Sequence, residues 1–339
     1  CRMVTAYPGT PSSEILSSVI RYKAHAPEVV YAEWSANEKV AFETALAASW
    51  SGLRAATAMK QVGLNVAADP FFSSAYTGVV GGFVVISCDD PGPHSSQTEQ
   101  DSRLLAHAAK VPVLDPSTPV EALQMTGLAF ELSERFQIPV LLRPTTRLCH
   151  ARQSFDSDAV LFPATAGPQA RGFHKDPQRW AATPAFRLKL HVELVQKLEA
   201  IEQEFETSEL NRIQGSFGEN GSAPVGVIAS GVAFHTALQV LRDFGADIPV
   251  LKLGTPYPLP RRLVGDFIRR CERVIVLEEP DATIELQISD RTRVRGRLDG
   301  TVPQAGELTP ERAAAILAEA LDEAGFPVPA PADERLTAL

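Results

Sequence analysis

The sequence predicts an α/β protein with two doubly wound, mostly parallel domains. Short apolar segments alternate with helical stretches over the first 150 residues, which is typical of a parallel sheet covered by helices on both faces. The alternation stops in a proline- and glycine-rich stretch and resumes near Pro224. With 339 residues, of which 45% are hydrophobic, the chain is long enough to bury two cores.

The first domain is predicted at residues 1–150. A first strand ends before Tyr7, and further strands are expected at the apolar segments 28–34, 54–59, 82–88, 111–115 and 138–144. Thr10 precedes a proline that fits the first helical position, so a helix is predicted to start there. Three further helix starts have the form of a capping box, a hydroxyl residue followed three positions later by glutamate: Ser35 with Glu38, Ser96 with Glu99, and Thr118 with Glu121.

Residues 151–222 are predicted to form an interdomain connection that contains a helix. Segments 162–173 and 175–184 are too rich in proline and glycine for regular structure, whereas segment 188–206 carries leucines at helical spacing.

The second α/β domain is predicted at residues 223–325, followed by an exposed tail at 326–339. Its strands are expected at 225–230, 248–254 and 273–279, and its helices at 232–244, 259–271 and 308–321. The last helix is predicted to begin at Thr309-Pro310.

Composition and charge exclude several classes of protein. A net charge of −9 without a basic cluster argues against a nucleic-acid partner. No apolar run approaches the length of a membrane span, and the first residues do not form a signal peptide, so we expect a cytoplasmic protein with no membrane partner. The chain opens on a cysteine rather than a methionine and is interpreted as a fragment.

The four cysteines do not form a recognisable metal or cluster site. They contain no C-x-x-C pair, so neither an iron–sulfur cluster nor a structural zinc can be placed on them. Cys88 and Cys271 lie in or beside apolar runs and are expected to be buried free thiols.

Six segments together identify a family. They are "YPGTPSSEI", "YAEWSANEKVA", "MKQVGLNVAADP", "DDPGPHSSQTEQD", "LKLGTPYPLP" and "GELTPE". In this order and spacing the chain resembles the thiamine-diphosphate-dependent 2-oxoacid:ferredoxin oxidoreductases, most closely the alpha subunit of indolepyruvate ferredoxin oxidoreductases. The resemblance implies a pyrimidine-binding domain followed by a transketolase C-terminal-like domain.

The resemblance also implies cofactors and partners. It implies thiamine diphosphate with Mg²⁺, the diphosphate and metal being held by a domain outside this sequence, and iron–sulfur clusters in a further segment. Neither the GDG signature of such a domain nor a cluster-binding cysteine run occurs here, so the chain is interpreted as the front half of a longer subunit, or as a homologue split into separate chains. The expected partners are a 2-oxoacid, coenzyme A, ferredoxin and a small partner subunit, in a homodimer or a dimer of heterodimers.

By the resemblance, Glu38 is the catalytic carboxyl group that shares a proton with the pyrimidine ring of the cofactor, which sets up the cofactor's own base. The alternative is the capping box, in which Glu38 reaches back to the amide of Ser35. One carboxyl group cannot easily do both.

The turn "YPGTP" is placed by the resemblance next to the reacting ring. Tyr7, Pro8 and Gly9 are then candidates for cofactor binding, and the hydroxyl of Thr10 is a candidate for the substrate. The alternative is a plain strand-to-helix turn.

The segment "MKQVGLN" follows a predicted strand and is expected to form a loop at the carboxyl edge of the sheet, where open α/β folds bind ligands. Lys60 and Gln61 are candidate substrate-binding residues, and Gly63, Leu64 and Asn65 candidate cofactor-binding residues. The alternative for Lys60 is a solvated surface charge.

Asp89 and Asp90 stand where the pyruvate-using relatives carry an arginine, which argues for a bulkier oxoacid than pyruvate. His94 is a further candidate for the substrate, and its alternative is a loop histidine held by a neighbouring acid. Trp34, Phe71 and Phe72 are possible apolar contacts for the substrate or ordinary core residues.

The leading hypothesis is therefore oxidative decarboxylation of an aryl 2-oxoacid such as indolepyruvate to its acyl-CoA, with electrons passed to ferredoxin. A second hypothesis keeps the fold without the chemistry, as a non-catalytic assembly domain or subunit of a thiamine enzyme. A third is a thiamine decarboxylase or transketolase-like enzyme without ferredoxin.

Overall fold

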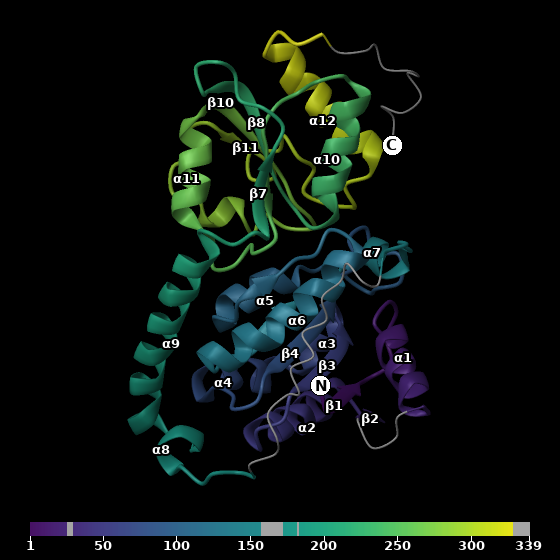
Figure 1. The fold of residues 1–339 in the computed structure, drawn as a ribbon, viewed down its shortest axis with the longest axis vertical. Helices are drawn as coiled ribbons and strands as arrows, with labels where there is room; N and C mark the ends of the chain where they lie inside the picture. Colours follow the sequence, from purple (N-terminus) through teal and green to yellow (C-terminus); the bar gives the residue numbers. More distant parts are fainter. Residues whose placement is uncertain (26–29, 157–171, 182, 328–339) are drawn as a thin grey trace.

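The chain contains two β-sheets in two separate parts of the sequence (Figure 1). The computed structural model describes residues 1–25, 30–156, 172–181 and 183–327. The α/β fold class predicted from the sequence is confirmed. The expected tail and part of the proline-rich connection lie outside the described residues.

The first sheet has six parallel strands in the order β2-β1-β3-β4-β6-β5. All six strands predicted for this part of the sequence are present. Their bounds are β1 Met3–Ala6, β2 Tyr31–Trp34, β3 Ala55–Lys60, β4 Phe83–Cys88, β5 Val113–Leu114 and β6 Val140–Leu142. Strands β3 and β4 are buried along their whole length, as expected for strands covered by helices on both faces.

The helices of the first sheet are α1 Ser13–Lys23, α2 Glu38–Trp50, α3 Gln61–Val66, α4 Ala68–Thr77, α5 Ser102–Ala109, α6 Pro119–Phe136 and α7 Thr146–His150. Because parallel crossovers are right-handed, the strand order places α1 and α6 on one face and α2, α4 and α5 on the other. Contacts of α4 with α2 and α5 agree with this arrangement. The core on that face includes Phe42, whose ring meets those of Phe71 and Phe83 edge-on.

The second sheet has five strands in the order β11-β10-β8-β9-β7, all parallel except β7, which runs antiparallel to β9. The strands are β7 Asn211–Gln214, β8 Ala223–Ser230, β9 Val250–Leu253, β10 Cys271–Leu277 and β11 Val294–Arg295. The helices are α10 Val232–Asp243, α11 Arg261–Arg269, η1 Glu285–Gln287 and α12 Pro310–Glu323. Strand β7 lies in the segment expected to be a connection, and the sequence did not predict it.

The helix predicted at 188–206 is α9, Pro184–Phe205, preceded by the short α8, Pro177–Trp180. Helix α9 runs along the side of the first sheet toward the second (Figure 1). Lys197 Nζ donates to the carbonyl of Gln137 in the first part of the chain. Glu206, which directly follows the C-terminal end of α9, accepts hydrogen bonds from the amides of Arg262 and Leu263 in the first turn of α11. The helix therefore ties the two sheets together.

The helix starts predicted at Thr118 and Thr309 are confirmed, and the one predicted at Ser96 is wrong. Thr118 caps α6 and Thr309 caps α12, each with proline next to it. No helix begins at Ser96, because its hydroxyl donates to Asp90 and the following helix, α5, starts later with Asp101 as its cap. Glu99 instead accepts from the amides of Gly92 and Gly306.

Two further expectations concern cysteines and membranes. Cys88 and Cys271 are buried free thiols, as expected. Within the ranges that the structure describes, no helix combines the length and the apolar character needed to cross a lipid bilayer.

Candidate active site

The carboxyl ends of β1, β2 and β3 meet at one edge of the first sheet. The strand register pairs Ala6 with Trp34 on one side and with Ala58 on the other, so the segments that follow these strands emerge next to each other. These segments are the turn 7–12, the start of α2 and the start of α3. They contain most of the residues that the sequence marks as candidates, at the place where open α/β folds bind ligands.

The carboxyl ends of the other three strands are covered by the second sheet. Arg143, directly after β6, donates to the carbonyl of Glu279, and the amide of Asp115, directly after β5, donates to the carbonyl of Gly254. Ser230, the last residue of β8, donates its hydroxyl to Asp115. The two sheets thus face each other by their carboxyl edges, and within the described residues the β1–β2–β3 part of the edge lies outside this contact.

The contact between the sheets is a layer of buried charges. Arg103 and Arg143 are closed off from solvent. Arg103 pairs with Asp101 at 2.6 Å and with Glu278 at 3.4 Å, and Arg143 pairs with Asp89 at 2.8 Å. Burial raises the pKa of Glu278 to about 7 and also raises the pKa of Asp89, which Arg143 opposes.

In the turn after β1, the predicted helix start at Thr10 is wrong. Helix α1 begins at Ser13, with Ser12 before it, and the Thr10-Pro11 peptide bond is cis. The turn is closed on Gly9 instead, because the hydroxyl of Ser13 accepts from the Gly9 amide while that of Ser12 donates to the Gly9 carbonyl. Thr10 is consequently exposed rather than bound to the helix amides.

Tyr7 and Pro8 also lie exposed in this turn. Gly9 is needed for space, since a Cβ atom there would lie 3.3 Å from Cβ of Lys60. The turn after β1 therefore packs directly against the end of β3.

Glu38 is the first residue of α2, and the capping-box alternative for it is wrong. The cap of α2 is Asn37, whose side chain accepts from the amide of Val40, while the Ser35 hydroxyl is buried without a partner among the described residues. The side chain of Glu38 is half-buried and its carboxylate makes no hydrogen bond or ion pair with the described residues. It is therefore available to a ligand.

Gly63 makes room for this carboxylate. A Cβ atom at position 63 would lie 2.6 Å from Oε1 of Glu38 and 2.7 Å from its Cγ. The expected loop after β3 is wrong, because Gln61–Val66 forms the short helix α3. Its glycine has ordinary helical φ and is explained by the close approach of Glu38 rather than by a turn.

Lys60 is buried and lacks a counter-charge. Its side chain is 8% exposed, and Nζ donates to the carbonyl of Ser95 at 2.6 Å and to the Ser95 hydroxyl at 3.2 Å. Within the described residues, Lys60 makes no ion pair with a carboxylate. The alternative of a solvated surface charge is therefore wrong. An ammonium group buried without an acid favours an anionic ligand nearby.

Ser95 connects the turn after β1 with the end of β3. Its hydroxyl also donates to the carbonyl of Thr10 at 3.3 Å, and its amide donates to Asp90. The sequence marked the surrounding motif but not this residue, and no spacing rule points to it, because its partners at positions 10 and 60 are far away along the chain.

The other candidates of α3 have different surroundings. Gln61 is buried, with Nε2 donating to the carbonyl of Thr98 and Oε1 left without a partner among the described residues. Leu64 is fully buried in the core. Asn65 is exposed and donates to the side chain of Gln100.

His94 lies in the loop 91–100 with its side chain 58% exposed. Its Nε2 is 3.5 Å from the carboxylate of Glu307, which belongs to the second part of the chain. This is the arrangement of the alternative, a loop histidine next to an acid.

The aromatic candidates differ in how deeply they are buried. Phe71 is in the core and Phe72 is half-buried against it, whereas Trp34 is 37% exposed at the end of β2. In the described ranges, no group of three or more His, Cys, Asp and Glu residues is arranged to hold a metal ion.

The family of the chain follows from its sequence. Residues 1–208 match the family model of pyruvate flavodoxin/ferredoxin oxidoreductase, thiamine diphosphate-binding, and the chain belongs to this family. It is 45% identical to the indolepyruvate oxidoreductase subunit IorA of Thermococcus kodakarensis over 325 residues, which cover 93% of this chain and 49% of that protein. The corresponding subunit of Methanothermobacter marburgensis is 44% identical over 312 residues, covering 90% and 49%. The chain spans about half the length of these relatives.

Solved structures show the same fold at low sequence identity. A 2-oxoglutarate:ferredoxin oxidoreductase from Magnetococcus marinus, solved with 2-oxoglutarate, coenzyme A and succinyl-CoA bound, superimposes with a TM-score of 0.71 at 19% identity, covering 94% of this chain and 62% of that one. A split-gene transketolase, described as an inactive beta4 tetramer, superimposes with a TM-score of 0.57 at 15% identity, covering 94% and 92%.

Proposed function

We propose that this chain is the pyrimidine-binding part of a subunit that oxidises aryl 2-oxoacids, with indolepyruvate as the type substrate. The observation that carries the proposal is the unpaired carboxylate of Glu38 at the open carboxyl edge, with Gly63 leaving space beside it. The similarity to IorA subunits supports the choice of an aryl substrate. In the reaction, the 2-oxoacid and coenzyme A give acyl-CoA, CO₂, a proton and two electrons, which ferredoxin accepts.

The residues present fit thiamine diphosphate. Glu38 offers a carboxylate that has no partner among the described residues, as a group that hydrogen-bonds a pyrimidine nitrogen must. Tyr7, Pro8 and Gly9 form the turn beside it, and Asn65 is exposed on α3. When bound, the cofactor would supply the nucleophilic carbon that attacks the 2-oxo group and the electron sink for decarboxylation.

The chain's own groups would hold the proton and the substrate. Glu38 would keep a proton shared between its carboxylate and the ring nitrogen, a task that needs a carboxylate not already used as a helix cap. Lys60 would bind the carboxylate of the 2-oxoacid, since its ammonium group has only Ser95 as a partner within the described ranges. The hydroxyl of Thr10 would donate to a substrate oxygen. Gln61 and His94 complete the proposed substrate side.

The proposal places the remaining parts outside this chain. Mg²⁺, the diphosphate-binding residues and the iron–sulfur clusters would be supplied by a further segment or by a partner subunit, in a cytoplasmic complex with two active sites. The proposed domain limits are 1–150 for the pyrimidine-binding domain, 151–222 for the connection and 223–325 for the second domain. The antiparallel strand β7 joins the connection to the second sheet.

The experiment compares two glutamates that each lie in the first turn of a helix, Glu38 in α2 and Glu14 in α1. The full-length protein with its partner subunit is assayed with indolepyruvate, coenzyme A, thiamine diphosphate, Mg²⁺ and ferredoxin. Glu38→Gln should lower kcat by at least about 100-fold, the usual contribution of general acid–base catalysis. The side chain of Glu14 is exposed and makes no hydrogen bond or ion pair with the described residues, so Glu14→Gln should keep wild-type activity.

Wild-type turnover in Glu38→Gln would refute the catalytic assignment and favour a non-catalytic assembly role. Turnover that needs Glu38 but no ferredoxin, and yields an aldehyde rather than acyl-CoA, would favour a thiamine decarboxylase.

A further inference from the structure

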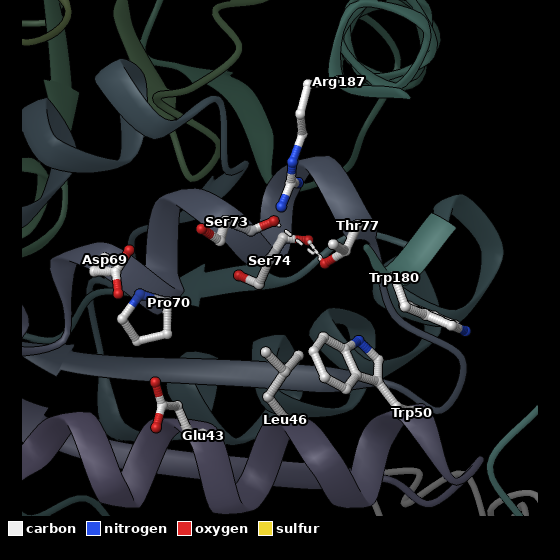
Figure 2. A pocket seen from close by; sticks show the side chains of 10 residues that line it. All are labelled: Glu43, Leu46, Trp50, Asp69, Pro70, Ser73, Ser74, Thr77, Trp180 and Arg187. Carbon is white, nitrogen blue, oxygen red and sulfur yellow. Dashed lines mark hydrogen bonds between the residues drawn. The ribbon is translucent and has the colours of Figure 1, made fainter. Parts of the chain in front are cut away.

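A cleft of about 350 Å³ lies between α2, α4 and α9, away from the candidate active site (Figure 2). Its volume is within the range of small-molecule sites, roughly 300–1,000 Å³. Trp50 closes the α2 side, Ser73 belongs to α4, Trp180 stands at the end of α8, and Arg187 projects from α9 toward Ser73 (Figure 2). The cleft is built from four helices.

Between the two ends of the cleft lies a positive charge that no described carboxylate neutralises (Figure 2). Arg187 makes no ion pair with a carboxylate in the part of the chain that the structure describes, and its Nη1 is buried without a hydrogen-bond partner. The guanidinium lies over the ring of Tyr76, 5.8 Å from its centroid, which holds it in place. The side-chain hydroxyl of Ser73 is likewise without a hydrogen bond among the described residues. The guanidinium is therefore a binding group for an anion.

A second arginine, Arg179, connects α4 with α9 and already has hydrogen-bond and ion-pair partners. Arg179 donates to the carbonyl of Thr77 at 2.7 Å and pairs with Glu193 at 2.8 Å. The contrast with Arg187 shows that this part of the fold has a carboxylate available for one arginine and leaves the other without one. Uncompensated charge at a cleft is costly unless a ligand supplies the counter-charge.

The end of the cleft opposite Glu43 and Asp69 is aromatic (Figure 2). Trp50 and Trp180 lie with their ring centroids 5.1 Å apart, and Leu46 and Pro70 line the adjoining wall. The indole nitrogens are occupied, because Trp50 donates to the carbonyl of Gly78 and Trp180 to that of His174. The rings therefore present carbon surface to a ligand, as suits a flat aromatic group.

The far end of the cleft is acidic. Glu43 and Asp69 lie there, and both are reached by Lys39, at 3.9 Å and 2.9 Å. The lysine offsets part of their charge but leaves carboxylate oxygens that can accept a hydrogen bond. This end disfavours a second anionic group on the ligand and favours an N–H or O–H donor.

From these observations we infer that the cleft binds an aryl carboxylate, with the carboxylate on Arg187 and a flat ring against the tryptophans. The site is distinct from the catalytic one. Its aromatic end is remote from Glu38, because Trp50 follows Glu38 by twelve positions on α2, about 18 Å along the helix, whereas Glu43 at the acidic end follows it by five, about 7.5 Å. The ligand class resembles the substrate proposed above, but the inference rests on the cleft alone and is tested without turnover.

The test is isothermal titration calorimetry of the full-length protein with indole-3-acetate. We expect saturable binding of one ligand per chain. Indole lacks the carboxylate, acetate lacks the ring, and glutarate carries a second carboxylate, so each should bind much more weakly. Arg187→Gln should weaken binding about 10- to 100-fold, the loss expected for a charge-assisted hydrogen bond. Arg187→Lys should restore part of the affinity.

The matched control is Lys189→Gln, which removes a positive charge from an exposed position of the same helix and should keep the wild-type affinity. Unchanged melting temperatures show that the variants fold. The inference is overturned if indole-3-acetate does not bind saturably, if Arg187→Gln binds as tightly as wild type, or if glutarate binds equally well. Because no step of this test requires turnover, the binding data can be interpreted even if the proposed function fails.

Discussion

Gly63→Ala should displace the Glu38 carboxylate without destabilising the fold. The new Cβ atom would lie 2.6 Å from Oε1 and 2.7 Å from Cγ of Glu38, whereas ordinary contact begins at 3.4 Å. The carboxylate would therefore have to move by about 0.8 Å. A displacement of roughly 1 Å at a reacting group can cost about 100-fold in rate, so we expect kcat with indolepyruvate to fall by up to that factor.

The same substitution should not destabilise the protein. Gly63 is inside α3 and has no positive φ, so alanine favours the helix by about 1 kcal/mol. This gain offsets the cost of moving Glu38, whose half-buried side chain can rotate outward. Thermal melting and the steady-state assay, done on one preparation, should show near-wild-type stability with reduced kcat.

The matched control is Gly265→Ala in α11. That glycine is also helical, and its added Cβ would meet only the tip of the Arg269 side chain, at 3.3 Å. This variant should keep full activity. Full activity in Gly63→Ala would refute the reasoning, because Glu38 would then not act from the position that the structure gives it.

Two further predictions concern charges. Lys60→Met should raise KM for the 2-oxoacid about 10- to 100-fold with a smaller change in kcat, because it removes the buried cation that we propose as the partner of the substrate carboxylate. Lys175→Met, at an exposed position, is the control, and a variant that loses kcat alone would contradict this role. Burial raises the pKa of Glu278 from 4.5 to about 7, so the native state retains a proton that the unfolded chain releases. The free energy of unfolding should then fall between about pH 4.5 and pH 7, by roughly 3 kcal/mol from this group. In urea titrations Glu278→Gln should flatten that decline, and an unchanged slope would rule out Glu278 as its source.

The sequence predicted the fold well where hydrophobic pattern decides the structure. The buried strands β3, β4, β8 and β10 lie where their apolar runs place them. Strand β7, "NRIQ", was missed because it is a four-residue edge strand with mostly exposed side chains, and its pairing with β9 is set by tertiary contacts.

Helix starts were less predictable because several residues near each start can cap. At α2, Ser35 and Asn37 both have suitable side chains, and only the backbone geometry decides for Asn37. At α5, Asp101 takes the role that Ser96 could have taken, since the Ser96 hydroxyl is used by Asp90.

The candidate site was predictable to the level of segments but not of contacts. The strand order brings the turn 7–12, Glu38 and Lys60 to one edge, as parallel strands require. Ser95 is hydrogen-bonded to Lys60, 35 positions away in the sequence, and to Thr10, 85 positions away. No local sequence pattern contains such distant pairs. Arg143 could have been noticed as a charge directly after an apolar strand, whereas its partner Glu279 lies 136 positions away.

The charged layer between the sheets bears on attempts to dissect this protein. An expression fragment that stops before the second sheet would keep Asp101 and Asp89 beside Arg103 and Arg143, but would replace Glu278 and the carbonyl of Glu279 by water. Such a truncation exposes to solvent a set of ion pairs that is buried in the intact chain, so the two halves should be produced and purified as one piece. Transplanting the thiamine-binding half onto another scaffold would require carrying the acidic residues of the other half with it.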